Sequence, residues 1–123
     1  MAIPATTTFI VHKGDKVIIR YVIEDAANLT GFKAYWAATP VADLTDKKIE
    51  KSTAGDFGDL GGIAISGTNV DVTLASTDTD EASTLGVALY ACQLHLEDSD
   101  GNPKVAAADV MDLKEAIKKL GVV

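Results

Sequence analysis

The side chains that could most readily act as nucleophiles, bases or metal ligands are one cysteine, two histidines and the acidic residues of short runs in the second half of the chain. Cys92 and His95 are close enough in sequence to suggest a nucleophile and its base. An extended segment would place them on opposite faces, however, which does not favour a nucleophilic pair. With one cysteine, neither an intramolecular disulfide nor a cysteine-based zinc site is possible. We interpret Cys92 as a small core residue.

Two acidic segments carry oxygen atoms at spacings that a cation can use. Asp98, Asp100 and Asn102 follow the i, i+2, i+4 spacing of a calcium loop, but the distal glutamate of an EF-hand is absent. The Asp-Gly pair inside this segment is also a hairpin-turn signal, and we favour the turn. We interpret the second segment, from Asp78 to Glu81, as an exposed acidic connection. Whether either segment binds a cation is left open by the sequence.

Catalytic and cofactor motifs are missing from the chain. There is no Gly-x-Ser-x-Gly and no phosphate-binding glycine loop. The glycine-rich stretch from Gly55 to Gly62 follows a charged segment and precedes a strand pattern rather than a helix, unlike a phosphate loop. We therefore expect a protein that is not an enzyme and that holds no cofactor and no metal in a catalytic role.

Charge and length limit the partners that we expect. The chain has 123 residues and a net charge of -7 at pH 7. Binding to nucleic acid or to anionic lipid needs a basic face, so we expect neither as a partner. No apolar run approaches the roughly 20 residues of a membrane-spanning helix, and the first residues lack the pattern of a secretory signal. We expect one domain over residues 1–123, made in a cytoplasm.

The segment from Leu85 to Asp98 organises the rest of the chain, because it has the densest apolar alternation. A period of two is the pattern of a half-buried strand. We expect a central strand with one face in the core and the other outside. The inner face would carry Tyr90, Cys92, Leu94 and Leu96, and the outer face Leu89, Ala91, Gln93 and His95.

Other extended segments are separated by turn signals every 8–12 residues or so, a spacing typical of an antiparallel β-sandwich. We expect seven or eight strands in all. The segment Lys16 to Glu24 is apolar on both faces and is expected to be central. The charged Lys47 to Lys51 suits an edge. The remaining expected strands are Thr6 to Val11, Phe32 to Ala38, Ile63 to Ser66, Asn69 to Leu74 and Lys104 to Ala108.

The two ends of the chain are the segments that a sandwich does not need for closure. Residues 1–7 are expected to form a flexible arm. Apolar residues after Asp109 recur at helical spacing and end before Gly121, which predicts a short C-terminal helix over 109–120. We expect both ends to contact partners. The candidate contact residues are Phe9, Val110, Leu113, Ile117 and Leu120.

Two features resemble an immunoglobulin-like sandwich. Trp36 is on the expected third strand, where that fold has its core tryptophan, and Tyr90-Ala91-Cys92 matches the Tyr-x-Cys of the strand with the tyrosine corner. The resemblance implies a core around Trp36, Tyr90, Cys92 and Leu94. The partner cysteine is replaced by the segment Tyr21 to Ile23, so such a domain would lack the disulfide.

The order of the turn signals resembles the immunoglobulin-like N-terminal domain of phage upper-baseplate proteins and related virion modules. The matching segments are Lys13-Gly14-Asp15, Leu29-Thr30-Gly31, Gly86 with Tyr90, and Asp98 to Gly101. The resemblance implies a non-catalytic structural protein of a bacteriophage particle, part of the baseplate, tail fibre, neck or capsid surface. Its partners would be other virion proteins, and it would be present in several copies or as a homo-oligomer. It would be made in the host cytoplasm and end up in the virion.

An alternative is a carbohydrate-binding or host-adhesion module. Such a module needs exposed aromatic side chains along a groove. Tyr35, together with Lys33, is expected to point outward from the strand that carries Trp36. This outward face is the one that a sugar or a protein would contact.

Overall fold

The computed structural model describes residues 8–23, 28–58, 60–79 and 86–115. The expected N-terminal arm, the acidic residues Asp80 and Glu81, and the candidate contacts Ile117 and Leu120 lie outside these ranges. The strands are β1 (Thr8–His12), β2 (Val17–Val22), β3 (Lys33–Pro40), β4 (Ile49–Thr53), β5 (Gly62–Ser66), β6 (Asn69–Leu74), β7 (Ala88–Glu97) and β8 (Pro103–Lys114), with one short helix, α1 (Ser76–Thr79), before β7.

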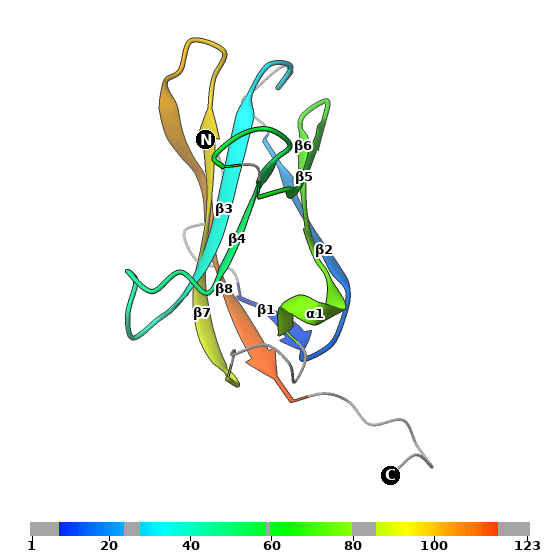
Figure 1. Cartoon of the computed structure of the whole chain (residues 1–123), viewed down its shortest axis with the longest axis vertical. Helices are drawn as coiled ribbons and strands as arrows, with labels where there is room; N and C mark the ends of the chain where they lie inside the picture. Colours follow the sequence, from blue (N-terminus) through cyan, green and yellow to red (C-terminus); the bar gives the residue numbers. More distant parts are fainter. Residues whose placement is uncertain (1–7, 24–27, 59, 80–85, 116–123) are drawn as a thin grey trace.

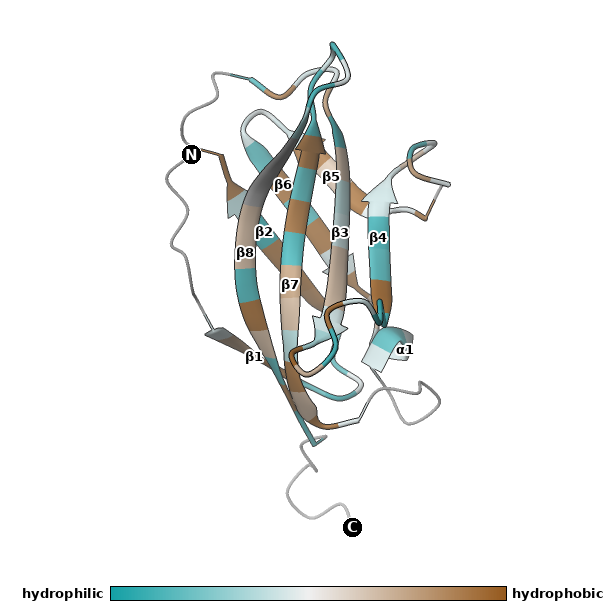
Figure 2. Ribbon diagram, turned by 90° about the vertical axis from the view of Figure 1, so that its left-hand side faces the viewer, coloured by the Kyte–Doolittle hydropathy of each residue, from teal (hydrophilic) through white to brown (hydrophobic). Residues whose placement is uncertain are grey.

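The strands are hydrogen-bonded in the order β1-β8-β7-β3-β4-β5-β6-β2, and they form two facing layers. The layers are joined where β4 pairs in parallel with β5, through Ser52 opposite Gly62 and Thr53 opposite Ile63. From there β5, β6 and β2 pass behind β4, β3, β7 and β8 in Figure 2, and in Figure 1, turned by 90°, they lie to the right of β3, β7 and β8. We call β1, β8, β7, β3 and β4 the front layer, and β5, β6 and β2 the back layer. The predicted all-β sandwich of seven or eight strands is confirmed, with eight.

Strand β7 is central to the front layer, as its alternation predicts. It pairs antiparallel with β3 on one side and with β8 on the other. In Figure 2 its residues alternate between hydrophobic and hydrophilic colours. Its inward side chains are buried, whereas Leu89 and Gln93 are exposed and His95 is half-buried on the outer face. The buried inward side chains are Tyr90, Cys92, Leu94 and Leu96.

The core lies between the layers and contains Trp36, which is fully buried. Burying a large apolar side chain stabilises the fold by about 1.5–3 kcal/mol. Cys92 is a free thiol within this core. The back layer contributes the buried side chains Val70, Val72 and Leu74 of β6.

Two details of the core define the sandwich as immunoglobulin-like. The hydroxyl of Tyr90 donates a 2.6 Å hydrogen bond to the carbonyl oxygen of Gly86, a few residues upstream, which is the geometry of a tyrosine corner. The order β2-β6-β5 faces β3-β7-β8, and Trp36 is on the strand that carries the core tryptophan in that fold. The implied fold is thus confirmed.

A chain of hydrogen bonds joins the two layers where a disulfide would otherwise do so. The indole Nε1 of Trp36 donates to the hydroxyl of Tyr21 at 3.0 Å. That hydroxyl donates to the Asp109 carboxylate at 3.0 Å. Tyr21 belongs to the back layer, whereas Trp36 and Asp109 belong to the front layer. Burial raises the pKa of Asp109 to about 6, although the hydrogen bond from Tyr21 opposes the rise.

The prediction of a helix over 109–120 is wrong for residues 109–114, which belong to strand β8. Strand β8 continues to Lys114 and pairs with β7 and, in parallel, with β1. Val110 and Leu113 fit helical spacing, but Met111 and Leu113 are also two apart, and both are fully buried. Pairing with the preceding strand β7 and with β1, which is distant in sequence, decides the outcome. Leu113 is therefore a core residue rather than an exposed contact, and Val110 and Phe9 are half-buried.

The prediction that Lys16 to Glu24 is a central strand is also wrong. Strand β2 ends the hydrogen-bonded order, next to β6 alone. Its outward residues Ile18 and Val22 are 60% and 49% exposed, so the second apolar face is not covered by the described residues. Between them, the Arg20 guanidinium makes two hydrogen bonds to the Asp71 carboxylate, at 2.8 and 2.9 Å.

Candidate functional site

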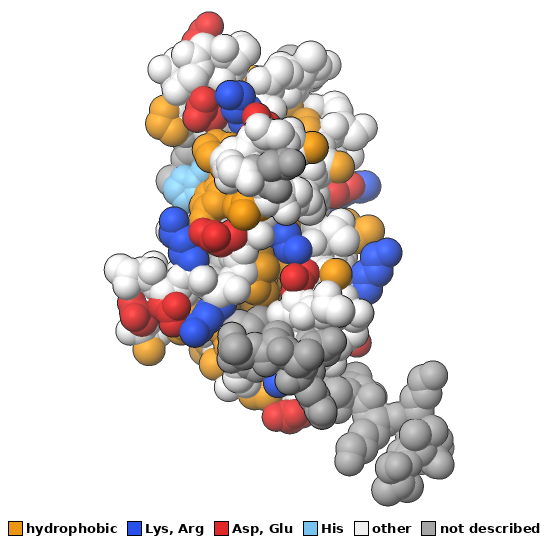
Figure 3. Space-filling view, in the orientation of Figure 1, with side chains coloured by type: hydrophobic (Ala, Val, Ile, Leu, Met, Phe, Trp, Pro, Cys, Tyr) orange, Lys and Arg blue, Asp and Glu red, His pale blue; other side chains and the backbone are white. Residues whose placement is uncertain are grey.

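The outer face of the front layer contains a hollow of about 380 Å³. Its floor consists of the outward residues of two paired strands, with Tyr35 opposite His95, Ala37 opposite Gln93 and Thr39 opposite Ala91. Its walls come from loops and from the end of β7, and they include Leu44, Lys47, Phe57 and Glu97. In Figure 3, hydrophobic side chains gather beside a histidine on the flank of the molecule, with charged groups of both signs next to them.

Phe57 forms one wall of the hollow from the loop that follows β4. Its φ of 49° is in the left-handed region, and it is the single non-glycine residue with positive φ within the described ranges. An L-residue pays roughly 1–2 kcal/mol for this conformation. The Phe57 side chain is nevertheless 42% exposed, so burial in the core does not explain its position. The ring centroid lies 5.6 Å from that of Tyr35, with the planes tilted by 52°.

The hydroxyl of Ser52 holds both ends of the Phe57 loop. Ser52 is fully buried, and its Oγ shares its proton between the backbone carbonyls of Thr53 and Asp56, at 3.0 and 2.9 Å. The same oxygen accepts hydrogen bonds from the backbone amides of Leu60 and Gly61, at 3.1 and 3.3 Å. One buried atom therefore fixes where the loop leaves β4 and where it returns to β5.

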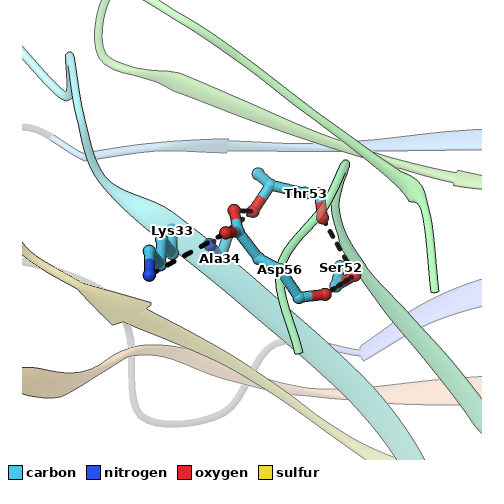
Figure 4. Close-up of polar contacts among 5 residues, drawn as sticks. All are labelled: Lys33, Ala34, Ser52, Thr53 and Asp56. Carbon is cyan, nitrogen blue, oxygen red and sulfur yellow. Dashed lines mark hydrogen bonds and ion pairs between the residues drawn. The ribbon is translucent and has the colours of Figure 1, made fainter. Parts of the chain in front are cut away.

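Further contacts fasten this loop to β3 (Figure 4). The Thr53 hydroxyl accepts a hydrogen bond from the Ala34 amide at 3.2 Å and donates to the Asp56 carboxylate. The Nζ of Lys33 lies 4.0 Å from Oδ1 of Asp56. The position of Phe57 is thus set by its neighbours in β3 and β4, and the wall exists before any ligand arrives.

Tyr35 is held from the opposite side of the hollow. Its hydroxyl donates a 2.7 Å hydrogen bond to Oε1 of Glu50. Burial, and then the Glu50 carboxylate, raise the pKa of Tyr35, so the phenol keeps its proton. The ammonium of Lys47 lies 5.4 Å from the centre of the Tyr35 ring and 4.0 Å from Glu50. The ring is therefore fixed by its neighbours while it remains partly exposed.

The polar groups that line the hollow include a histidine beside a glutamine. Nε2 of His95 lies 3.2 Å from Oε1 of Gln93, on the same strand. His95 also packs near Tyr35, with ring centroids 6.3 Å apart. Most of the residues that line the hollow are apolar or aromatic, and Lys47 and Glu97 supply one charge of each sign. This arrangement favours an apolar or aromatic group with polar edges.

The structure separates Cys92 from His95, as predicted. Cys92 points into the core, where burial raises the pKa of its thiol. His95 is on the outer face, in the hollow. A cysteine thiol is activated as a nucleophile by a lowered pKa, which is the opposite shift.

The acidic segment at the β7–β8 connection forms the predicted turn. The Asp98 carboxylate accepts hydrogen bonds from the backbone amides of Asp100 and Asn102, at 3.0 and 2.9 Å. In the other segment, Asp78 accepts from the Ala75 amide at 2.7 Å and lies 2.9 Å from Lys51. Within the described part of the chain, no three potential metal-ligating side chains form a cluster.

Sequence reasoning found the outward position of Tyr35 but missed the walls around it. Leu44 and Phe57 are single apolar residues in loops, and nothing local in the sequence shows that these loops flank the same sheet face. One available signal was a phenylalanine among closely spaced glycines, since such a loop needs left-handed backbone.

Comparison with known proteins finds likeness in structure but none in sequence. No family model matches the chain, and no curated protein matches it closely. A solved structure of the extracellular domain of the voltage-gated sodium channel beta4 subunit has a TM-score of 0.49 and 12% identity, covering 95% of this chain and 98% of that one. That channel domain is described as a parallel homodimer with a role in cell–cell adhesion. Within the described residues, no helix is long and apolar enough to cross a membrane.

Proposed function

We propose that this chain is a non-catalytic immunoglobulin-like module that binds other proteins through the hollow on its front layer. The observation that carries the proposal is Phe57, an exposed ring in a costly backbone conformation that the hydrogen bonds of Ser52 maintain. Strain of this kind gathers at ligand-binding sites, where the surroundings over-determine the local structure. A side chain that is already ordered also loses less entropy when a partner binds.

In its finer form the proposal places the module in a bacteriophage particle, bound to other virion proteins and present in several copies. Support comes from the order of turn segments that resembles phage baseplate and related virion modules. The glycines of three of these segments, Gly14, Gly31 and Gly101, have φ values of 87°, 82° and 86°. They therefore occupy turn positions that favour glycine, which fits the matched pattern. The location would be the virion, after synthesis in the host cytoplasm.

Carbohydrate binding is the second candidate, and a specific observation favours it. Tyr35 and Phe57 present ring surfaces in the hollow, while Gln93 and Glu97 supply hydrogen-bonding groups. A sugar ring needs this combination of an apolar face and polar edges. A glycan array with the purified chain tests it: selective signal that is lost in Phe57→Gly would favour the sugar over the protein partner.

Intact particles provide the test of the leading proposal. Phages carrying the wild-type chain, Phe57→Gly, or the matched control Ile18→Ser in the back layer would be purified, and the chain counted by quantitative mass spectrometry. We expect wild type and Ile18→Ser in every particle, and a loss of about tenfold or more for Phe57→Gly, as is typical when an interface hot spot is removed. Absence of the wild-type chain from particles would refute the phage role. Full incorporation of Phe57→Gly would refute the role of the hollow.

A further inference from the structure

Resting on the proposed protein-binding function, we infer that the hollow receives an extended segment of a partner polypeptide. That segment inserts one aromatic or large apolar side chain between Phe57 and Tyr35. It carries a lysine or arginine beside that anchor, directed toward Glu97.

The dimensions of the hollow fit one anchor side chain. A volume of about 380 Å³ lies near the lower end of the pockets that bury small ligands, roughly 300–1,000 Å³. The floor between Tyr35 and Leu44 includes Ala37 and Ala91, whose side chains end at Cβ. The hollow is therefore deepest over these two alanines, where a partner side chain would enter. The whole space is too small for a packed helix.

The walls favour an aromatic or large apolar group as that anchor. Phe57 and Tyr35 already form a tilted pair with centroids 5.6 Å apart. A third ring placed against them would gain edge-to-face contacts as well as burial. Anchors of this kind, seated in a pocket that exists beforehand, carry most of the binding energy in protein interfaces.

The charge around the hollow selects the residue next to the anchor. Glu97 lines the hollow, and its carboxylate has no ion pair within the described residues. Its cross-strand neighbour Lys33 lies at Asp56 instead. Asp98 and Asp100 follow directly in the turn, so this end of the hollow is acidic.

The other end of the hollow does not offset this acidity. Lys47 lies over the Tyr35 ring and beside Glu50. A basic side chain on the partner would therefore be attracted to the Glu97 end, and the chain's net charge of -7 would speed its approach. The same net charge disfavours a second copy of this chain as the occupant.

Selection from a random library of 12-residue peptides displayed on yeast, with the purified full-length chain as bait, tests the inference. We expect enrichment of Phe, Trp, Tyr or Leu next to Lys or Arg. Synthetic peptides from the enriched set should weaken about tenfold or more with Phe57→Gly. With Glu97→Gln they should weaken about threefold to tenfold, and this second loss should shrink at high salt. Ile18→Ser, on the back layer, should bind as wild type.

Several outcomes would overturn the inference. The selection could enrich no peptides, or enrich peptides that lack the apolar anchor or the basic neighbour. The binding measurement could show that Phe57→Gly leaves affinity unchanged. If methyl glucoside displaces the peptides, the occupant of the hollow is a sugar instead of a peptide. If sedimentation shows that the chain dimerises through this face, the occupant is a second copy of the chain. Particle incorporation is measured separately, so a failure here is distinguishable from a failure of the phage proposal.

Discussion

Trp36 and Tyr35 are neighbours on β3, but they belong to two clusters that combine similar groups for different purposes. Trp36 points inward, where its indole nitrogen meets Tyr21 and, beyond it, Asp109. Tyr35 points outward, where its ring meets Phe57 and its hydroxyl meets Glu50. Both regions combine aromatic rings with a carboxylate. The inner one is closed, since Trp36 is fully buried, whereas Phe57 in the outer one is 42% exposed.

The comparison shows how one strand separates stability from binding. In the described part of the chain, every buried side-chain nitrogen and oxygen has a hydrogen-bond partner. The inner cluster therefore has no unused polar group to offer a ligand, and its bonds serve to join the two layers. The outer cluster leaves Phe57 partly exposed, and Glu97 lines the same hollow. Changes at the neighbouring residues Tyr35 and Trp36 of β3 should thus affect different measurements.

The largest expected effect is on the inner side. Trp36→Ala should lower the free energy of unfolding by about 3–5 kcal/mol, because it opens a cavity and removes the donor to Tyr21. Tyr35→Ala, one residue away, should cost about 1 kcal/mol and abolish peptide binding. Urea denaturation followed by circular dichroism measures both. If Trp36→Ala does not fold, Leu94→Ala, expected to cost about 2–5 kcal/mol, replaces it. Equal losses for Tyr35→Ala and the core variant would contradict the separation.

A smaller effect concerns the carboxylate of the inner cluster. Because burial raises the pKa of Asp109 to about 6, above its ordinary value of 3.8, the folded state binds more protons between these values. The contribution of this group to stability is therefore present below about pH 4 and is lost as the pH rises to about 6. Asp109→Asn should remove this part of the pH dependence.

The measurement for Asp109 is the difference in unfolding free energy between wild type and Asp109→Asn, recorded from pH 4 to pH 7. Other carboxylates, including Asp43 and Asp71 with their lowered pKa values, titrate in both proteins and cancel in the difference. Glu50→Gln, in the outer cluster, is the matched control. A difference that does not vary with pH would show that Asp109 titrates normally.

What the sequence predicts depends on how local the signal is. The alternation of β7 is continuous, so its two faces and the burial of Tyr90, Cys92 and Leu94 follow from local spacing. The end of β8 is different, because Val110 and Leu113 fit one face of a helix while Met111 and Leu113 fit one face of a strand. Pairing selects the strand: β8 pairs with β7, the strand just before it, and with β1, which is about 100 residues earlier in the chain.

The candidate site shows the same limit. The outward direction of Tyr35 follows from the position of Trp36, and the structure agrees. Its partners Phe57, Glu50 and Lys47 reach it through the paths of loops and through β3–β4 pairing. The predicted helix begins at Asp109, yet the carboxylate of this residue is hydrogen-bonded to Tyr21, 88 positions away. Contacts at that separation leave no trace in a local pattern.

The smallest expected effect on stability is at Phe57, and it provides the sharpest test of the outer region. At a φ of 49°, glycine relieves backbone strain of roughly 1 kcal/mol that alanine retains. Both substitutions lose the ring contact with Tyr35. Phe57→Gly should therefore be within about 0.5 kcal/mol of wild type and more stable than Phe57→Ala by about 1 kcal/mol, as measured by urea denaturation.

Both Phe57 variants should lose peptide binding, because the ring rather than the backbone makes the contact. If Phe57→Ala were as stable as Phe57→Gly, the loop would relax once the ring is removed. The left-handed conformation would then be imposed by the ring rather than by the Ser52 hydrogen bonds.

The variant Ser52→Ala separates these cases. It should destabilise the fold by about 1–3 kcal/mol, since it leaves the Leu60 and Gly61 amides without their acceptor, and it should weaken binding while Phe57 is still present.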